Sequence, residues 1–271
     1  MTPQCLRSHW ATIGLLMLII IPTAARPQSA DSAARLPERN ILRSEAMVMV
    51  NYDRWNDQRD PLRETQLVVR HNTNRGVGIA RLSHSARFGL RDDKLDVEAY
   101  PTFRGGYAAL GASYAPNARL YARSTLTAEL FANLQRRLEV SLGSRRLNFA
   151  SPVNVFTGSV GAYEHEFLFT ARAYHAVGGA EGTTGVLSAR RYFADERQYI
   201  GIHLATGSLP EYIRTAADIV TTSSRSIGAE GVFTLRTRWL LTLRAEAGRD
   251  DTKATGPVRH ASGTIGLGVR F

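Results

Sequence analysis

Beyond Met47 the sequence repeats one pattern, in which apolar side chains alternate with polar or small ones. In residues 241–248, for example, Leu and Ala alternate with Thr, Arg, Glu and Gly. Because successive side chains of a β-strand point to opposite faces, this pattern gives each strand an apolar face and a charged face. Helical patterns of period 3.6 are nearly absent, so the chain is predicted to be all-β.

Fourteen segments follow this pattern, and clusters of turn-forming residues separate them. They are predicted at 47–54, 63–72, 75–86, 93–103, 105–115, 121–134, 136–148, 152–163, 165–176, 182–194, 197–208, 224–236, 238–250 and 257–271. The even-numbered connections are all tight, whereas most odd-numbered ones, including 87–92, are longer. An even strand count with short turns at one end and longer loops at the other is typical of an outer-membrane barrel.

A soluble β-sandwich is the alternative, because it shows the same alternation. Two features favour the barrel. The last segment alternates toward a terminal aromatic residue, Phe271, and bacterial outer-membrane barrels characteristically end this way. Aromatic residues also gather at the predicted strand ends, where rings would lie at the level of the lipid headgroups: Tyr52, Trp55, Tyr100, Phe103, Tyr107, Tyr114, Tyr121, Phe149, Tyr163, Phe193 and Trp239.

These features together predict a closed, transmembrane, antiparallel β-barrel of fourteen strands over residues 47–271. Twelve strands remain the alternative, if the first two segments form a plug or a periplasmic hairpin.

The first twenty-five residues have the three parts of a secretory signal peptide. Arg7 supplies a positive charge, residues 11–21 are continuously apolar, and small residues precede a predicted cut after Ala25. The apolar stretch is much shorter than the ~20 residues of a membrane-spanning helix. Residues 26–46 are polar and are predicted to be a flexible periplasmic lead-in. The bacterial outer membrane is therefore the expected location.

If Phe271 faces lipid, the alternation turns the charged face of every strand into the barrel. The residues predicted to line the lumen are Glu98, Glu129, Glu139, Arg145, Arg172, Arg190, Arg236, Arg244 and Glu246. Both signs of charge occur, so arginine forks could pair with carboxylates on neighbouring strands. A structural ladder of charges is favoured over a selective pore, because small barrels fill their interiors with side chains.

One sequence motif suggests catalysis. His260 and Ser262 lie two residues apart, so they share a face and could form a histidine-activated serine. Barrel enzymes that hydrolyse lipids carry such a pair on the outside, whereas the register set by Phe271 turns both residues inward. The seven histidines show no metal-binding spacing. We therefore predict no enzyme activity, no catalytic residue, no metal site and no cofactor.

The net charge of +10 suggests an anionic partner. Nucleic acid is implausible outside the cytosol, so outer-membrane lipids and lipopolysaccharide are the expected partners, through loop arginines such as Arg87, Arg91 and Arg119. The barrel-assembly machinery is expected to recognise Phe271, and the protein is expected to be a monomer.

Several stretches resemble the YaiO family of outer-membrane β-barrel proteins over roughly residues 47–271. They are Arg87-Phe88-Gly89, Ala99-Tyr100-Pro101, Arg146-Leu147-Asn148-Phe149, residues 155–161 and residues 188–195. The resemblance implies a surface-exposed outer-membrane barrel and brings no catalytic residues. Some relatives carry the barrel after helical repeats, in the manner of exopolysaccharide exporters. The expected lead-in is too short for one ~34-residue repeat.

Three functions follow from these observations. The leading hypothesis is a structural or interaction protein at the cell surface. A narrow pore or polysaccharide-export conduit is the alternative, and a lipid or lipopolysaccharide hydrolase is the second alternative.

Overall fold

All regular structure in the computed structural model is β-strand, over the described residues 44–56, 60–135, 137–193, 197–208, 221–252 and 256–271. The strands are β1 (Ser44–Trp55), β2 (Leu62–Thr73), β3 (Gly76–Arg87), β4 (Leu90–Phe103), β5 (Gly106–Tyr114), β6 (Ser124–Gln135), β7 (Leu138–Asn148), β8 (Val153–Glu164), β9 (Phe167–Gly178), β10 (Gly182–Tyr192), β11 (Tyr199–Gly207), β12 (Thr221–Leu235), β13 (Trp239–Thr252) and β14 (Gly256–Arg270). Within these ranges, no helix is long and apolar enough to cross a membrane.

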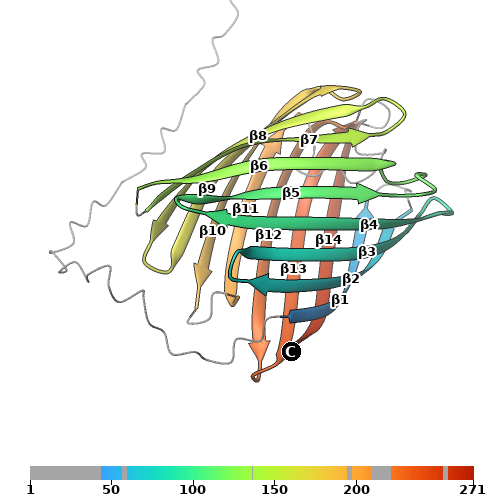
Figure 1. Ribbon diagram of the computed structural model, residues 1–271. Coiled ribbons are helices and arrows are strands. Elements are labelled where there is room, and N and C mark those ends of the chain that lie inside the picture. The colour runs from blue at the N-terminus through green and yellow to red at the C-terminus, as the bar shows by residue number, and fades with distance from the viewer. Residues whose placement is uncertain (1–43, 57–59, 136, 194–196, 209–220, 253–255) are drawn as a thin grey trace, which may run out of the picture. The chain divides into compact units, whose positions relative to one another are not determined.

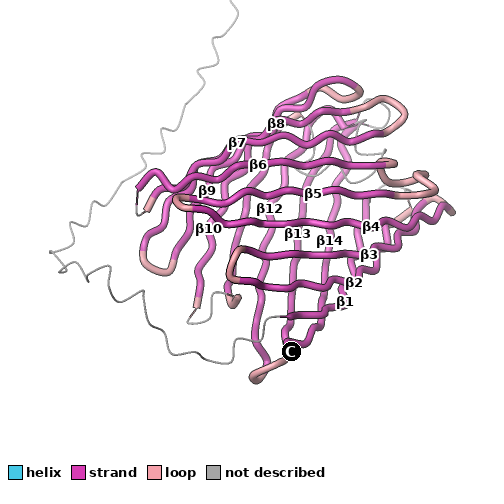
Figure 2. Tube along the Cα trace, viewed as in Figure 1, coloured by secondary structure: helices cyan, strands magenta, loops and turns pink. Residues whose placement is uncertain are grey.

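The strands form one closed barrel (Figures 1 and 2). Each strand pairs antiparallel with its neighbour in sequence, and β1 closes the barrel by pairing with β14. In Figure 1 the front strands cross the rear strands steeply, because strands in a barrel tilt relative to its axis. The prediction of fourteen strands is confirmed. The twelve-strand alternative is wrong, since β1 and β2 are part of the wall.

The barrel begins at Ser44, rather than at residue 47 as expected. The predicted signal peptide, and the predicted lead-in up to residue 43, lie outside the described residues.

The first strand begins and the last strand ends at the same rim of the barrel. The backbone amide of Ser44 donates to the carbonyl of Phe271 at 3.0 Å, and the amide of Phe271 donates back at 2.9 Å. This rim also carries the even-numbered connections, and we call it the turn end; the opposite rim is the loop end. Short turns face the periplasm in outer-membrane barrels, so the loop end faces outward.

One connection at the loop end is shorter than expected. The loop expected at 87–92 is instead a two-residue turn between β3 and β4. Phe88 and Gly89 have φ values of 54° and 69°, which is the backbone of a type I′ hairpin turn. The prediction was wrong because the charged residues after Gly89 continue the strand.

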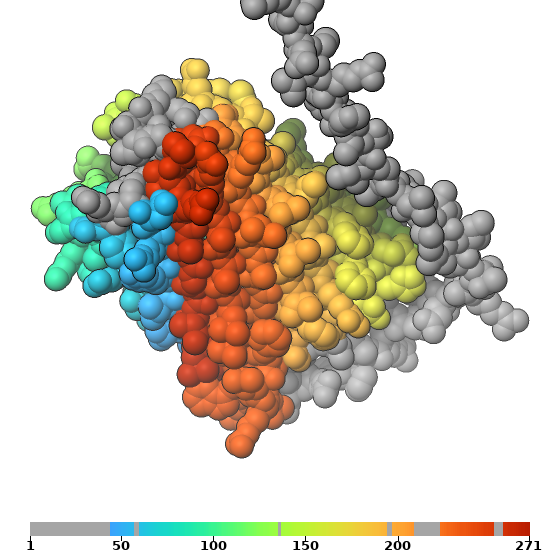
Figure 3. Space-filling model, turned by 180° about the vertical axis from the view of Figure 1, so that it is seen from behind, coloured from blue at the N-terminus to red at the C-terminus, as the bar shows by residue number. Residues whose placement is uncertain are grey.

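The outer wall of the barrel is apolar. Leu142 is 74% exposed, and Ile202, Leu187 and Leu126 are each at least 58% exposed. Tyr52, Phe103, Tyr114, Phe193 and Trp239 also face outward near the strand ends. Figure 3 presents this wall from the side of β12–β14. Such a belt is far larger than the apolar patches of soluble proteins, so hydrocarbon is what covers it.

A charge placed on this wall is expected to destabilise the barrel. Leu142→Arg should lower the free energy of unfolding in lipid vesicles by about 2–4 kcal/mol, because an arginine near the midplane must be desolvated. Urea titration followed by tryptophan fluorescence measures the change, and Leu142→Met is the control. Equal stability of the two variants would contradict a lipid-covered wall at this position.

Candidate functional site in the barrel lumen

Ion pairs cross the inner wall of the barrel. Arg172 on β9 lies 3.0 Å from Glu129 on β6. The arginine reaches over β7 and β8, where Ser141 and Ser159 occupy the positions between the charges. The Ser141 hydroxyl donates to Glu129 at 2.6 Å. Small side chains on the intervening strands therefore make room for a long arginine to join distant strands.

A second pair has the same construction. Arg190 on β10 lies 2.8 Å from Glu230 on β12, and Gly201 on β11 lies between them in the register. Arg81 on β3 pairs in the same cavity with Glu98 on β4 at 3.3 Å. These pairs place positively and negatively charged side chains next to each other on the inner wall of the barrel.

The ion pairs do not fill the barrel. A cavity of about 800 Å³ remains inside, lined by residues from β2 to β13. Its lining includes seven of the residues predicted for the lumen: Glu98, Glu129, Glu139, Arg145, Arg172, Arg190 and Arg244. Glu246 lies beside this lining, 3.0 Å from Arg244.

Arg236 does not line the lumen, and its prediction was wrong. Strand β12 ends at Leu235, and Arg236 lies exposed in the turn that follows, with a φ of 59°. The alternation of inward and outward side chains stops where the strand ends, so it cannot place a turn residue.

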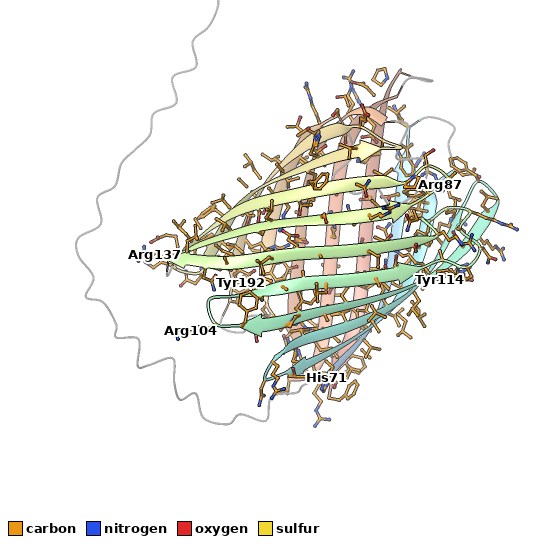
Figure 4. All side chains as sticks on the ribbon, turned by 45° about the horizontal axis from the view of Figure 1, so that its top comes forward. His71, Arg87, Arg104, Tyr114, Arg137 and Tyr192 are labelled. Carbon is orange, nitrogen blue, oxygen red and sulfur yellow. The ribbon has the colours of Figure 1, made fainter. Side chains whose placement is uncertain are left out.

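Aromatic rings line the lumen near the turn end. Tyr107 and Phe131 stack with ring centroids 4.3 Å apart and planes at 7°. Tyr192 and Tyr199 pack at 5.7 Å. Tyr163 also lines the cavity. Figure 4 shows Tyr192 at the same end of the barrel as Arg104 and Arg137.

Several of these aromatics were expected to lie at the lipid headgroups. That prediction was wrong for Trp55, Tyr100, Tyr107, Tyr121 and Tyr163, because their side chains face inward or are buried. For the four of these residues that lie on strands, the alternation of inward and outward side chains carried the signal that could have placed them. Tyr100, for instance, shares the parity of Glu98, and its hydroxyl donates to that carboxylate at 2.6 Å.

The connection between β5 and β6 folds into the lumen at the loop end. We call residues 115–123 the inward loop. Asp92, only 1% exposed, accepts the backbone N–H groups of Arg119, Leu120 and Tyr121, each at 3.0 Å. A carboxylate that accepts three backbone hydrogen bonds anchors the segment firmly. Strand six was predicted from residue 121, but the inward loop delays its start to Ser124.

Tyr121 adds a second anchor to the inward loop. Its hydroxyl donates to Glu64 and contacts the Ser85 hydroxyl, and the Lys94 ammonium lies 4.6 Å from its ring centroid. Burial, and next the Glu64 carboxylate, raise the pKa of Tyr121 above its usual value, so the phenol remains a donor at neutral pH.

The three arginines expected to contact lipopolysaccharide have different positions. Arg87 is 3% exposed, and its guanidinium lies 4.1 Å from the centroid of the Trp55 ring inside the barrel. It therefore cannot reach the outer leaflet. Arg91 and Arg119 are exposed at the loop end. Figure 4 marks Arg87 at this end.

Glu246 is the centre of a charged cluster on β11–β14. Its carboxylate lies 3.0 Å from Arg244, 3.4 Å from Nε2 of His203 and 3.7 Å from Nε2 of His260. Two glycines make this possible. His203 is paired with Gly228 and His260 with Gly248, and a Cβ at either glycine would overlap the imidazole.

His260 and Ser262 both lie on the inner face of β14, as the register predicted. The ring of His260 contacts carboxylates on both sides, since Nδ1 lies 3.0 Å from Asp250 and Nε2 faces Glu246. Among the described residues, no group of three or more His, Cys, Asp or Glu side chains is arranged to hold a metal ion.

Comparison with known proteins decides the family. The profile described as "YaiO membrane beta barrel domain" matches residues 44–212, well over half of the chain. The chain belongs to this family. The YaiO assignment places the protein in the bacterial outer membrane. No match was found among curated proteins.

Solved structures share the barrel. A bacterial polysaccharide outer membrane secretin aligns with a TM-score of 0.50 at 6% identity, covering 84% of this chain and 98% of that one. An anion-selective porin from Comamonas acidovorans aligns with a TM-score of 0.47 at 10% identity, with the same coverage. The KdgM porin aligns with a TM-score of 0.47 at 8% identity, covering 83% of this chain and 99% of that one. At these identities the likeness concerns the fold alone.

Removing the charge of Glu246 is expected to destabilise the barrel. Glu246→Gln should lower the free energy of unfolding by about 2 kcal/mol, because Arg244 and two imidazoles lose their shared carboxylate. Glu164→Gln is the control, since its 2.7 Å pair with Arg137 is mostly exposed and should be worth under about 0.5 kcal/mol. Urea unfolding in vesicles compares the two, and equal losses would contradict the assigned role.

Proposed function

We propose that this barrel is a narrow conduit for hydrophilic solutes across the outer membrane. The observation that carries the proposal is the cavity of about 800 Å³, which the lumen side chains leave open. Its lining extends from Tyr192 near the turn end to Tyr121 and Leu147 near the loop end. A polar path along most of the barrel suits the movement of a solute rather than a purely structural core.

The inward loop narrows this conduit at the loop end. Ala122 of the loop packs in an apolar cluster with Leu147, Val153 and Val155 of the wall. With Asp92 holding the loop backbone, this cluster limits the width available to a solute. A solute that passes this narrowing is therefore a small molecule or an extended chain.

The lining also favours a class of solute. Arg190–Glu230 and Arg172–Glu129 present donors and acceptors side by side, and both signs of charge balance locally. Tyr107 and Tyr163 add flat faces with polar hydroxyl groups nearby. Polyhydroxylated, sugar-like molecules match this mixture of rings and paired hydrogen-bonding groups better than small ions of one sign.

The conduit is tested by unitary conductance in planar bilayers. We expect small steps for the native protein and larger steps for Asp92→Ala, because the inward loop loses the acceptor of three backbone hydrogen bonds. Asp93→Ala is the matched control. Asp93 is the next residue on β4, but it is exposed and pairs with His84 outside the barrel. The conductance steps of Asp93→Ala should equal those of the native protein.

A structural or interaction role is the second candidate. The observation in its favour is that ion pairs such as Arg172–Glu129 join strands that are not neighbours, which stiffens the wall. Silent bilayers with both the native protein and Asp92→Ala would contradict the conduit and favour this role.

A further inference from the structure

Three arginines form a row on the outer wall at the loop end. Arg225 on β12 is paired in the register with Arg249 on β13, which is paired with Arg259 on β14. All three side chains are exposed, and Arg249 is 59% exposed. Arg54 on β1, also exposed, is paired with Ala261 one position below the row.

Like charges directly opposite one another destabilise a sheet. Among the residues that the structure describes, Asp251 alone reaches this row, with its carboxylate 3.6 Å from Nε of Arg249. In the part of the chain that the structure describes, the side chains of Arg225 and Arg259 make no ion pair. The row therefore carries more positive charge than the described part of the chain compensates.

Below the arginines the outer wall is hollowed by small side chains. The next two positions of β13 and β14 carry Ala247 and Ala261, then Ala245 and Gly263. A Cβ added at Gly263 would meet no atom within 4 Å. Bulkier residues return one position lower, with Leu243 paired with Ile265. The result is a shallow apolar depression that opens directly under the arginine row.

The depth of the row in the membrane also matches that of the lipid phosphates. From Ala261 to Phe271 the outward positions of β14 are apolar or glycine. At about 3.4 Å per residue and the usual tilt, this stretch covers most of the ~25 Å apolar band of an outer-membrane barrel. Arg259 and its two neighbours therefore lie just beyond the hydrocarbon, at the level where the outer leaflet carries its phosphates.

We propose that this surface is a binding site for a phosphorylated glycolipid of the outer leaflet, of the lipid A type. The phosphate groups lie on the row of Arg225, Arg249 and Arg259, whose guanidinium forks match phosphate oxygens. One acyl chain lies in the depression over Ala245 and Ala247. The site is on the outside of the barrel, so it is independent of any transport through the lumen.

The test is a titration of the detergent-solubilised barrel with bis-phosphorylated lipid A, with bound lipid counted by native mass spectrometry. Replacing all three arginines of the row by glutamine should weaken binding about a hundredfold, given the usual contribution of one arginine at an anionic surface. The control replaces Arg63, Arg104 and Arg146, which are exposed on β2, in the turn after β4 and on β7. It removes the same charge from positions that do not adjoin one another.

The expected result is that the control binds the lipid as the native protein does, and that dephosphorylated lipid A binds weakly to all three proteins. Equal binding by the row variant and the control would overturn the proposal, and so would tight binding of the dephosphorylated lipid. Migration on unboiled gels establishes that each variant is folded, so a loss of binding is not mistaken for a loss of structure.

Discussion

Closure of the hydrogen-bond ladder is the constraint on which the rest of this structure depends. In hydrocarbon no water can satisfy a free backbone amide or carbonyl, so a sheet survives there only without edges. The pairing of β1 with β14 removes the two edges, and the reciprocal bonds between Ser44 and Phe271 complete it at the turn end.

Because the barrel is closed, every strand has one face toward lipid and one face toward the water-filled lumen. The outer positions meet lipid and are apolar, whereas the inner positions meet water and carry charge. Burying charge is costly unless it is paired, and the lumen meets this requirement with arginines that reach across serine or glycine positions to distant carboxylates. The small residues on the inner face are thus as necessary to the ion pairs as the charges.

The two ends of the barrel differ in ways that matter for function. The turn end is lined with tyrosines, whereas the loop end is narrowed by a segment that Asp92 and Tyr121 hold inside. On the outer wall, the loop end carries an arginine row above a depression of small residues. The two proposals thus concern separate surfaces, the lumen for a solute and the outer wall for lipid.

The sequence by itself determined the fold class, the strand count and the direction in which strand residues such as Glu129 and His260 point, because a period of two is a local property. The tertiary structure determined the contacts between strands, which the alternation of side chains along one strand does not show. It brought Arg172 to Glu129 across two strands, turned residues 115–123 inward, and aligned Arg225 with Arg249 and Arg259. These contacts depend on the register between strands and on where each strand stops, which only the closed sheet fixes.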